Sequence, residues 1–170
     1  MGLFDFVKGK GKKVLDEDTE AKPEDGKTAE QVETERKVAA MAAELKELGL
    51  GADDVKLTLR SDKETVKIES KGADRETMEK LILAIGNIQG IAKVEADLPK
   101  KVAGAGGDDK LAGGDDEPVF HTVESGETLS AIAKKYLGNA NRYNEIFEAN
   151  RPMLSDPDKI YPGQTLRIPG

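Results

Sequence analysis

The feature that most constrains this chain is a long stretch, residues 100–118, in which Gly, Ala and Asp predominate. Its sequence, KKVAGAGGDDKLAGGDDEP, has the composition of a flexible tether rather than of a packed element. A second polar stretch, residues 16–28, contains Pro23 and Gly26. We therefore predict four regions: a tip with its linker at 1–29, a module at 30–99, a linker at 100–118 and a second module at 119–170.

The first module alternates between helical and extended patterns. Apolar residues recur at spacings of three and four between Val38 and Leu48, which predicts a helix. Two runs with period-two alternation, VKLTLR and TVKIES, flank a polar turn and predict an antiparallel hairpin. A second helix is expected from about Asp74 to Gly86, and a last strand at Lys93–Leu98. The order αββαβ predicts two helices on one face of a three-stranded sheet.

The sequence pattern of the second module predicts the order βααβ. A short strand at Phe120–Val123 precedes Thr128, which is a good N-cap residue. The helix that follows ends at Gly138, and a second helix is expected at about Asn141–Ala149. A closing strand follows at Thr165–Ile168. The whole chain therefore belongs to the α+β class, with two small modules joined by a Gly/Asp-rich linker.

Composition excludes several functional classes. The chain has no cysteine, and His121 is its single histidine, which rules out a disulfide framework, a thiolate zinc site and a multi-histidine metal site. The net charge of −7 opposes binding to nucleic acid or to an anionic membrane. No catalytic motif with known spacing is present, so we expect a binding protein and not an enzyme. Because the start, MGLFDFVK, lacks the order of a secretory signal, we also expect a cytoplasmic protein.

Three motifs carry a resemblance to known families. The segment from Phe120 to Ile168, with VESGETLSAIAKKY and IYPGQTLRIP, resembles a LysM module along nearly its whole length. The region from Glu30 to Leu98, ending in GNIQGIAKVEADL, resembles a BON domain. Together with the MGLFDFVK start, this arrangement is similar to the bacterial cytoplasmic potassium-binding protein family.

The residues themselves indicate a cation site at the end of the second predicted helix. A helix end leaves up to about four carbonyl groups without intrahelical partners and carries a partial negative charge. Gly86 and Gly90 permit unusual backbone angles there. No carboxylate lies between Leu81 and Lys93, so neutral carbonyl oxygens are the expected ligands. A glycine after a helix is more often only a C-cap, and that alternative stays open at this point.

The resemblance extends this interpretation to particular residues. It implies that backbone carbonyls of the tip and of the GNIQGI loop bind K⁺, or Rb⁺ or Cs⁺ in its place. The matching positions are Val7, Lys8, Lys10, Gly86, Ile88 and Ile91. We expect the ion to order the tip, with Leu3, Phe4 and Phe6 packed on the BON-like module. We also expect the LysM module to dock on that module within a compact monomer.

The alternative function is binding of N-acetylglucosamine-containing glycans by the LysM module. LysM modules bind such glycans through the loop after the first strand and the loop before the last. The matching residues are Gly126, Glu127, Thr128, Leu129, Ile160, Tyr161 and Pro162. The same residues also serve as turns, caps and core of the fold, and a cytoplasmic location would keep the module away from cell-wall polymers.

Overall fold

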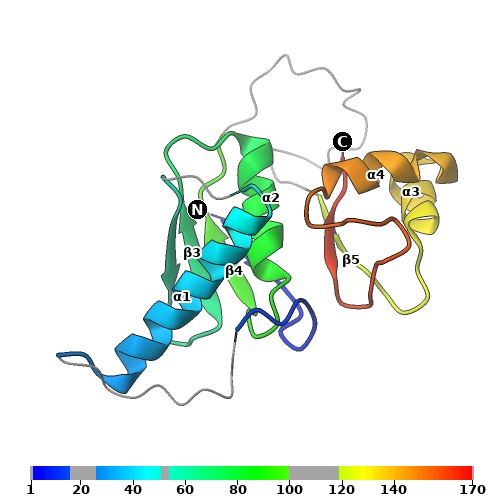
Figure 1. The fold of residues 1–170 in the computed structure, drawn as a ribbon. Helices are drawn as coiled ribbons and strands as arrows, with labels where there is room; N and C mark the ends of the chain where they lie inside the picture. The colour runs from blue at the N-terminus through cyan, green and yellow to red at the C-terminus, as the bar shows by residue number, and fades with distance from the viewer. Residues whose placement is uncertain (1, 16–25, 51–53, 100–118, 170) are drawn as a thin grey trace.

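The computed structural model describes residues 2–15, 26–50, 54–99 and 119–169 (Figure 1). The predicted linker at 100–118 and most of the one at 16–28 lie outside these residues. The first part of the chain contains β1 (Gly2–Asp5), α1 (Ala29–Glu47), β2 (Lys56–Leu59), β3 (Thr65–Glu69), α2 (Arg75–Gly86) and β4 (Lys93–Ala96). The second part contains β5 (Phe120–Thr122), α3 (Leu129–Leu137), a 3₁₀ turn (Ala140–Arg142), α4 (Tyr143–Ala149) and β6 (Thr165–Arg167). The α+β class predicted for the chain is thereby confirmed.

The first sheet has four strands in the order β1-β4-β3-β2, and not the three that we predicted. Strands β2 and β3 form the expected antiparallel hairpin, while β4 runs parallel to β3. The additional strand is the tip, since β1 pairs antiparallel with β4 from Gly2 opposite Ala96 to Asp5 opposite Lys93. The tip thus supplies backbone partners to an edge of β4 that would otherwise be unpaired.

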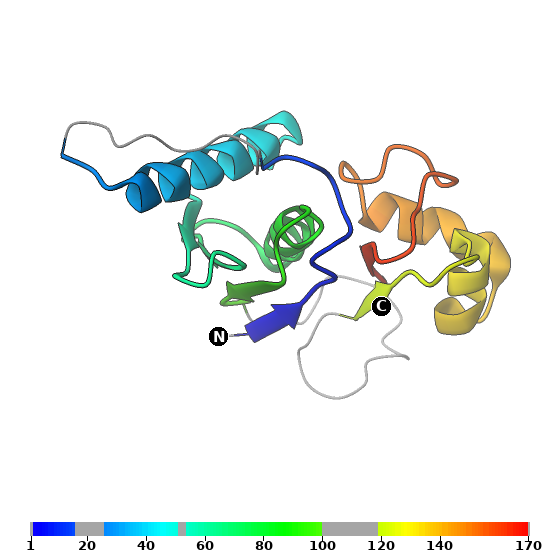
Figure 2. The same cartoon turned by 90° about the horizontal axis from the view of Figure 1, so that it is seen from below.

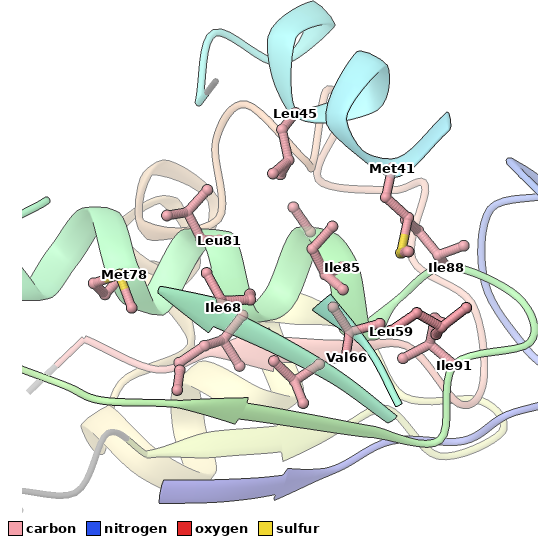
Figure 3. Close-up of a cluster of buried hydrophobic side chains, with 14 of the residues drawn as sticks. Met41, Leu45, Leu59, Val66, Ile68, Met78, Leu81, Ile85, Ile88 and Ile91 are labelled. Carbon is pink, nitrogen blue, oxygen red and sulfur yellow. The ribbon is translucent and has the colours of Figure 1, made fainter. Parts of the chain in front are cut away.

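Helices α1 and α2 bury one face of this sheet in a common core (Figure 3). Met41 and Leu45 reach down from α1, and Leu81 and Ile85 from α2, and all four are almost completely buried. The first turns of α1 are polar, and a capping box between Thr28 and Gln31 fixes where the helix starts.

The apolar side chains of the tip differ in how far they are buried. Phe4 and Phe6 pack against it as expected. Leu3 is 53% exposed, so its expected packing on the first module is wrong. Within a strand, successive side chains point to opposite faces of the sheet, and Leu3 lies on the face away from Phe4.

The second part follows the predicted βααβ order, with β5 and β6 paired antiparallel. The Thr128 side chain caps α3 by accepting a hydrogen bond from the Ala131 amide, and Gly138 ends the helix with a φ of 73°. The second predicted helix starts as a 3₁₀ turn, capped by Asn139, and becomes α-helical only at Tyr143. Among the described residues, no helix combines the length and the apolar character needed to cross a membrane.

Helix α2 lies between the first sheet and the second part of the chain (Figures 1 and 2). One side of the helix packs on β3, β4 and α1, and β6 packs against another side. The Phe4 and Phe120 rings also meet, with centroids 5.5 Å apart. Met153 and Phe120, both from the second part, reach the core of the first.

Candidate metal site

The candidate site forms where the tip passes the C-terminal end of α2. After β1, the chain runs alongside the loop that follows α2, and backbone hydrogen bonds link the two segments. Lys12 donates to the Asn87 carbonyl at 2.8 Å and accepts from the Gln89 amide at 2.9 Å. Phe6 donates to Ala92 at 2.8 Å. The structure therefore brings together the tip and the GNIQGI loop, the two segments from which the cation ligands were predicted.

Two glycines allow this close approach, each for its own reason. A Cβ atom on Gly86 would lie 2.2 Å from the Phe6 ring, so Gly86 makes room for an aromatic side chain. A Cβ on Gly11 would lie 1.9 Å from the Asn87 carbonyl oxygen, and Gly11 has a φ of +124°. The unusual backbone angle expected at Gly90 is present, with a φ of 102°. Gly86 does not have a positive φ, so for that residue the expected reason was wrong.

The predicted carbonyl ligands differ in their hydrogen bonding. Those of Val7, Lys8 and Ile88 each accept one backbone amide, from Lys10, Gly90 and Ile91, at 3.0, 2.9 and 3.1 Å respectively. A carbonyl oxygen has two lone pairs, so one such bond leaves an acceptor position open. Within the described residues, the carbonyls of Lys10, Gly86 and Ile91 accept no hydrogen bond. Within the described residues, none of the six oxygens thus accepts more than one backbone hydrogen bond. Neutral carbonyl oxygens are the kind of ligand that suits a large monovalent cation.

The lysines of the tip could repel a cation, but two of them are held by carboxylates on other elements. The Lys8 ammonium pairs with Glu64, and the Lys12 ammonium bonds both oxygens of Glu44, at 2.6 and 2.8 Å. Glu44 is buried, with 7% of its surface exposed. These pairs partly neutralise the positive charge near the helix end. Among the described residues, no three acidic or histidine side chains gather as a metal-binding cluster.

The loop also contacts β6 directly through Asn87. The Asn87 side chain donates to the Thr165 carbonyl at 2.8 Å and accepts from the Thr165 amide at 2.9 Å. Lys10 of the tip lies against Gly163, where an added Cβ would meet its Cγ at 2.6 Å. Both segments of the candidate site therefore touch the second part of the chain.

A buried charged cluster reinforces this contact at the other end of α2. Glu79, only 3% exposed, accepts a hydrogen bond from Arg75 at 2.9 Å and also pairs with Arg167 of β6. Neither Asn87 nor Glu79 was predicted as a contact residue. For Asn87 the available signal was a polar residue directly after an apolar helical stretch. Glu79 lies in the polar first half of α2, next to Lys80, so the local sequence gave no such signal for it.

Comparison with known proteins assigns the chain to a family. A model of the LysM domain matches residues 121–169. A protein of Escherichia coli O6:H1 named potassium binding protein Kbp is 42% identical over 170 residues, which cover 99% of both chains. This chain belongs to the Kbp family. An uncharacterized protein of Deinococcus radiodurans is 38% identical over 86 residues, which span 49% of this chain and 32% of that protein.

Membership of the Kbp family extends over the tip, the first module and the LysM domain together, because the alignment covers nearly the whole chain. The tip–loop contact and the Asn87–Thr165 contact both lie within this aligned length. The candidate site therefore lies within the length that is similar to Kbp, and its proposed ligands lie outside the residues that the LysM model matches.

The glycan-binding residues predicted for the LysM domain differ in the cavities that they line. Thr128 and Leu129 line a cavity of about 250 Å³ together with Tyr143. Tyr161 instead lines a different cavity, which lies between the two parts of the chain. Gly126, Ile160 and Pro162 line neither of these two cavities.

Glu127, another predicted glycan contact, is engaged inside the LysM domain. Its carboxylate accepts the Glu124 amide at 2.8 Å and lies 2.7 Å from Nε2 of His121. These contacts lower the pKa of Glu127, the backbone hydrogen bond from Glu124 being the larger cause. His121 is buried, and its other ring nitrogen lies 3.1 Å from the Tyr136 hydroxyl, so it packs inside the domain.

Proposed function

We propose that this member of the Kbp family is a potassium-binding protein. The ligands are backbone carbonyls of the tip and of the loop after α2, at Val7, Lys8, Lys10, Gly86, Ile88 and Ile91. The observation that carries the proposal is the backbone pairing of tip and loop, in which Lys12 bonds to both Asn87 and Gln89. The name of the Escherichia coli relative, which states potassium binding, supports it.

The chemistry of these ligands favours a large monovalent ion. Potassium is well served by several neutral carbonyl oxygens, whereas Ca²⁺ and Mg²⁺ prefer sites that include carboxylates. The end of α2 adds the negative end of a helix dipole without adding a full charge. We propose that Rb⁺ and Cs⁺ can replace K⁺, because carbonyl cages discriminate by size and ligand number.

Ion binding is proposed to favour the compact arrangement of the chain. The ion would hold the tip against the loop, and the loop holds β6 through Asn87. At a free ion concentration about 100 times the dissociation constant, binding would stabilise the bound form by about 2.7 kcal/mol. The protein would then act as a cytoplasmic potassium sensor or buffer, as a monomer and without catalytic activity.

Thermal unfolding in KCl and in NaCl at equal ionic strength tests the proposal. We expect a higher melting temperature in K⁺, Rb⁺ or Cs⁺ than in Na⁺. The Gly86→Ala variant should lose most of this difference, since its methyl group would displace the Phe6 ring. Gly9→Ala is the matched control, because an added Cβ at Gly9 meets nothing within 4 Å. Equal melting temperatures in all four salts would contradict the proposal.

Glycan binding by the LysM domain is the second candidate. The observation that favours it is the cavity of about 250 Å³ beside Thr128 and Leu129, at the start of α3. A titration with oligomers of N-acetylglucosamine tests it, and Tyr143→Ala should abolish saturable binding. An absence of saturable binding to the unaltered protein would remove this candidate while leaving the potassium proposal unaffected.

A further inference from the structure

Glu44 is a buried carboxylate on α1, close to the tip and to the loop after α2. It is the one buried acidic residue of this helix, all of which the structure describes. Its neighbours in sequence on the same side of the helix, Met41 and Leu45, belong to the core. Glu44 also lines the cavity between the two parts of the chain, together with Lys12 and Asn87. A carboxylate in such a position needs a partner.

The partner of Glu44 comes from the tip. The Lys12 ammonium donates to both carboxylate oxygens, at 2.6 and 2.8 Å. Within the described residues, the Glu44 side chain forms no other hydrogen bond or ion pair. The Lys12 side chain is 59% exposed, so water would solvate its ammonium if the tip left, whereas the carboxylate would stay buried. Separation is therefore unfavourable mainly at Glu44, because a buried charge would lose its partner.

The backbone of Lys12 is the point at which the tip pairs with the loop. Lys12 donates to Asn87, accepts from Gln89, and lies opposite Ile88 in a parallel bridge. Ile88 is one of the proposed ligands, and Lys10, another, lies two residues before Lys12 in the tip. Lys12 is thus attached to the loop by its backbone and to α1 by its side chain. Both attachments hold the proposed ligands of the tip beside those of the loop.

We propose that Glu44 is a positioning residue of the ion site and acts through Lys12. By holding the Lys12 side chain, Glu44 keeps the tip docked on the loop before the ion binds. When only a fraction of a protein is in the form that binds a ligand, the observed affinity falls by that fraction. If loss of the contact lowers the docked fraction to about a tenth, the dissociation constant of the ion rises about tenfold. The effect on affinity rests on the proposed potassium binding, whereas the effect on docking does not.

The variant Lys12→Met separates this role from a simple effect of charge. Lys12 is a cation on the tip, so removal of its charge alone would lessen repulsion and tighten the binding of K⁺. The contact with Glu44 predicts the opposite, because a methionine side chain cannot hold the carboxylate and the tip would dock less often. Lys12→Arg keeps donors for both carboxylate oxygens, so its affinity for K⁺ should stay within about threefold of that of the unaltered chain.

The test is an NMR titration of the full ¹⁵N-labelled chain with KCl, with NaCl keeping the ionic strength constant, followed at the Gln89 amide. We expect the dissociation constant to rise about tenfold in Glu44→Gln and in Lys12→Met. The double variant should also bind about tenfold more weakly, and not about a hundredfold, because both changes remove the same contact. Lys13→Met and Glu47→Gln, at exposed positions on the tip and on α1, are the matched controls and should bind K⁺ unchanged.

Hydrogen exchange in NaCl alone tests the docking of the tip without the ion. In Glu44→Gln, the Lys12 and Gln89 amides should exchange at least about tenfold faster, whereas the Ile85 amide in the core of α2 should be unaffected. A general loss of stability would accelerate all three amides. Equal acceleration at all three, or no acceleration at Lys12 and Gln89, would overturn the proposal.

The titration distinguishes failure of this proposal from failure of the proposed function. If the unaltered chain and Glu44→Gln bound K⁺ equally well, Glu44 would have no positioning role, while the proposed function would stand. Tighter binding in Lys12→Met would show that Lys12 acts only by its charge and would also overturn the proposal. If the unaltered chain showed no saturable shift with K⁺, the proposed function would fail, and the role of Glu44 in ion binding with it.

Discussion

The side-chain amide of Asn87 pairs with the backbone of Thr165 through two hydrogen bonds, as the backbone of a neighbouring strand would. Its side-chain amide donates to the Thr165 carbonyl at 2.8 Å and accepts the Thr165 amide at 2.9 Å. Asn87 is also the C-cap residue of α2 and the second residue of the GNIQGI loop. The loop that is proposed to hold the ion is therefore joined to the first residue of β6 by two hydrogen bonds.

Replacing Asn87 with alanine should loosen the contact between the two parts of the chain. The change removes both hydrogen bonds and leaves two polar groups of Thr165 without these partners, so we expect a loss of about 1–3 kcal/mol. Small-angle scattering should show a larger radius of gyration for Asn87→Ala. Gln89→Ala, in the same loop, is the control and should scatter like the unaltered protein. An unchanged radius in Asn87→Ala would show that this contact does not hold the parts together.

The pair of Glu79 and Arg167 should be sensitive to the loss of either partner. Removing one partner of a buried ion pair typically costs about 3–5 kcal/mol when the other charge is left unpaired. In Arg167→Met, Glu79 keeps its hydrogen bond from Arg75, so the loss should lie below this range. We expect Arg167→Met to lower the free energy of unfolding in urea by more than about 1 kcal/mol, because Glu79 stays buried with one partner fewer. The exposed pair of Arg142 and Glu145 provides the comparison, and Glu145→Gln should cost less than about 1 kcal/mol. Similar losses at both pairs would argue against a special role for Glu79.

Stability should fall at low pH partly through Glu33. Hydrogen bonds from Lys63 and Lys37 lower the pKa of Glu33 to about 2, from an ordinary value of 4.5. A lowered folded-state pKa stabilises the protein above the unfolded-state value, and this stabilisation is lost as the pH falls from about 4.5 towards 2. Glu33→Gln should therefore reduce stability at pH 6 and have little effect near pH 2.

Urea unfolding at several pH values measures this dependence. Glu47→Gln, at an exposed position near the end of α1, is the control and should leave the pH profile unchanged. If Glu33→Gln lowered stability equally at pH 6 and pH 2, the effect would be steric and not electrostatic.

Gly11 should be necessary for the pairing of the tip with the loop. In Gly11→Ala the added methyl group would collide with the Asn87 carbonyl, at a φ of +124° that alanine rarely adopts. The hydrogen bonds between Lys12 and the loop should then open. Hydrogen exchange of the Lys12 and Gln89 amides should accelerate by at least about tenfold, whereas Gly9→Ala should leave it unchanged. If the Lys12 and Gln89 amides exchanged equally slowly in Gly11→Ala and Gly9→Ala, Gly11 would not be necessary for this pairing.

Local signals in the sequence were enough to predict most of the helices and strands. The cap at Thr128 and the glycine at position 138 mark the ends of α3 without reference to the rest of the chain. The apolar spacing likewise predicted α2, and Asp74, at which the helix was expected to begin, is its N-cap residue. These elements could be predicted because their start and stop signals lie within one or two turns of the residues that they control.

The features that the sequence did not reveal depend on partners far along the chain. The tip has only four residues in β1, and its partner is β4, so its short alternation could not be distinguished from a packing arm. The need for glycine at position 86 comes from the Phe6 ring and not from a backbone angle. Asn87 and Thr165 are 78 residues apart in the sequence, and no local pattern connects them.

Locating the ion tests the proposed potassium site most directly. Crystals of the full chain grown in RbCl instead of KCl would give an anomalous signal at the rubidium absorption edge. We expect one strong peak between the tip and the loop, surrounded by main-chain oxygens that include those of Lys10, Gly86 and Ile91. A well-ordered tip with no peak there, or a peak only beside carboxylates elsewhere, would contradict it.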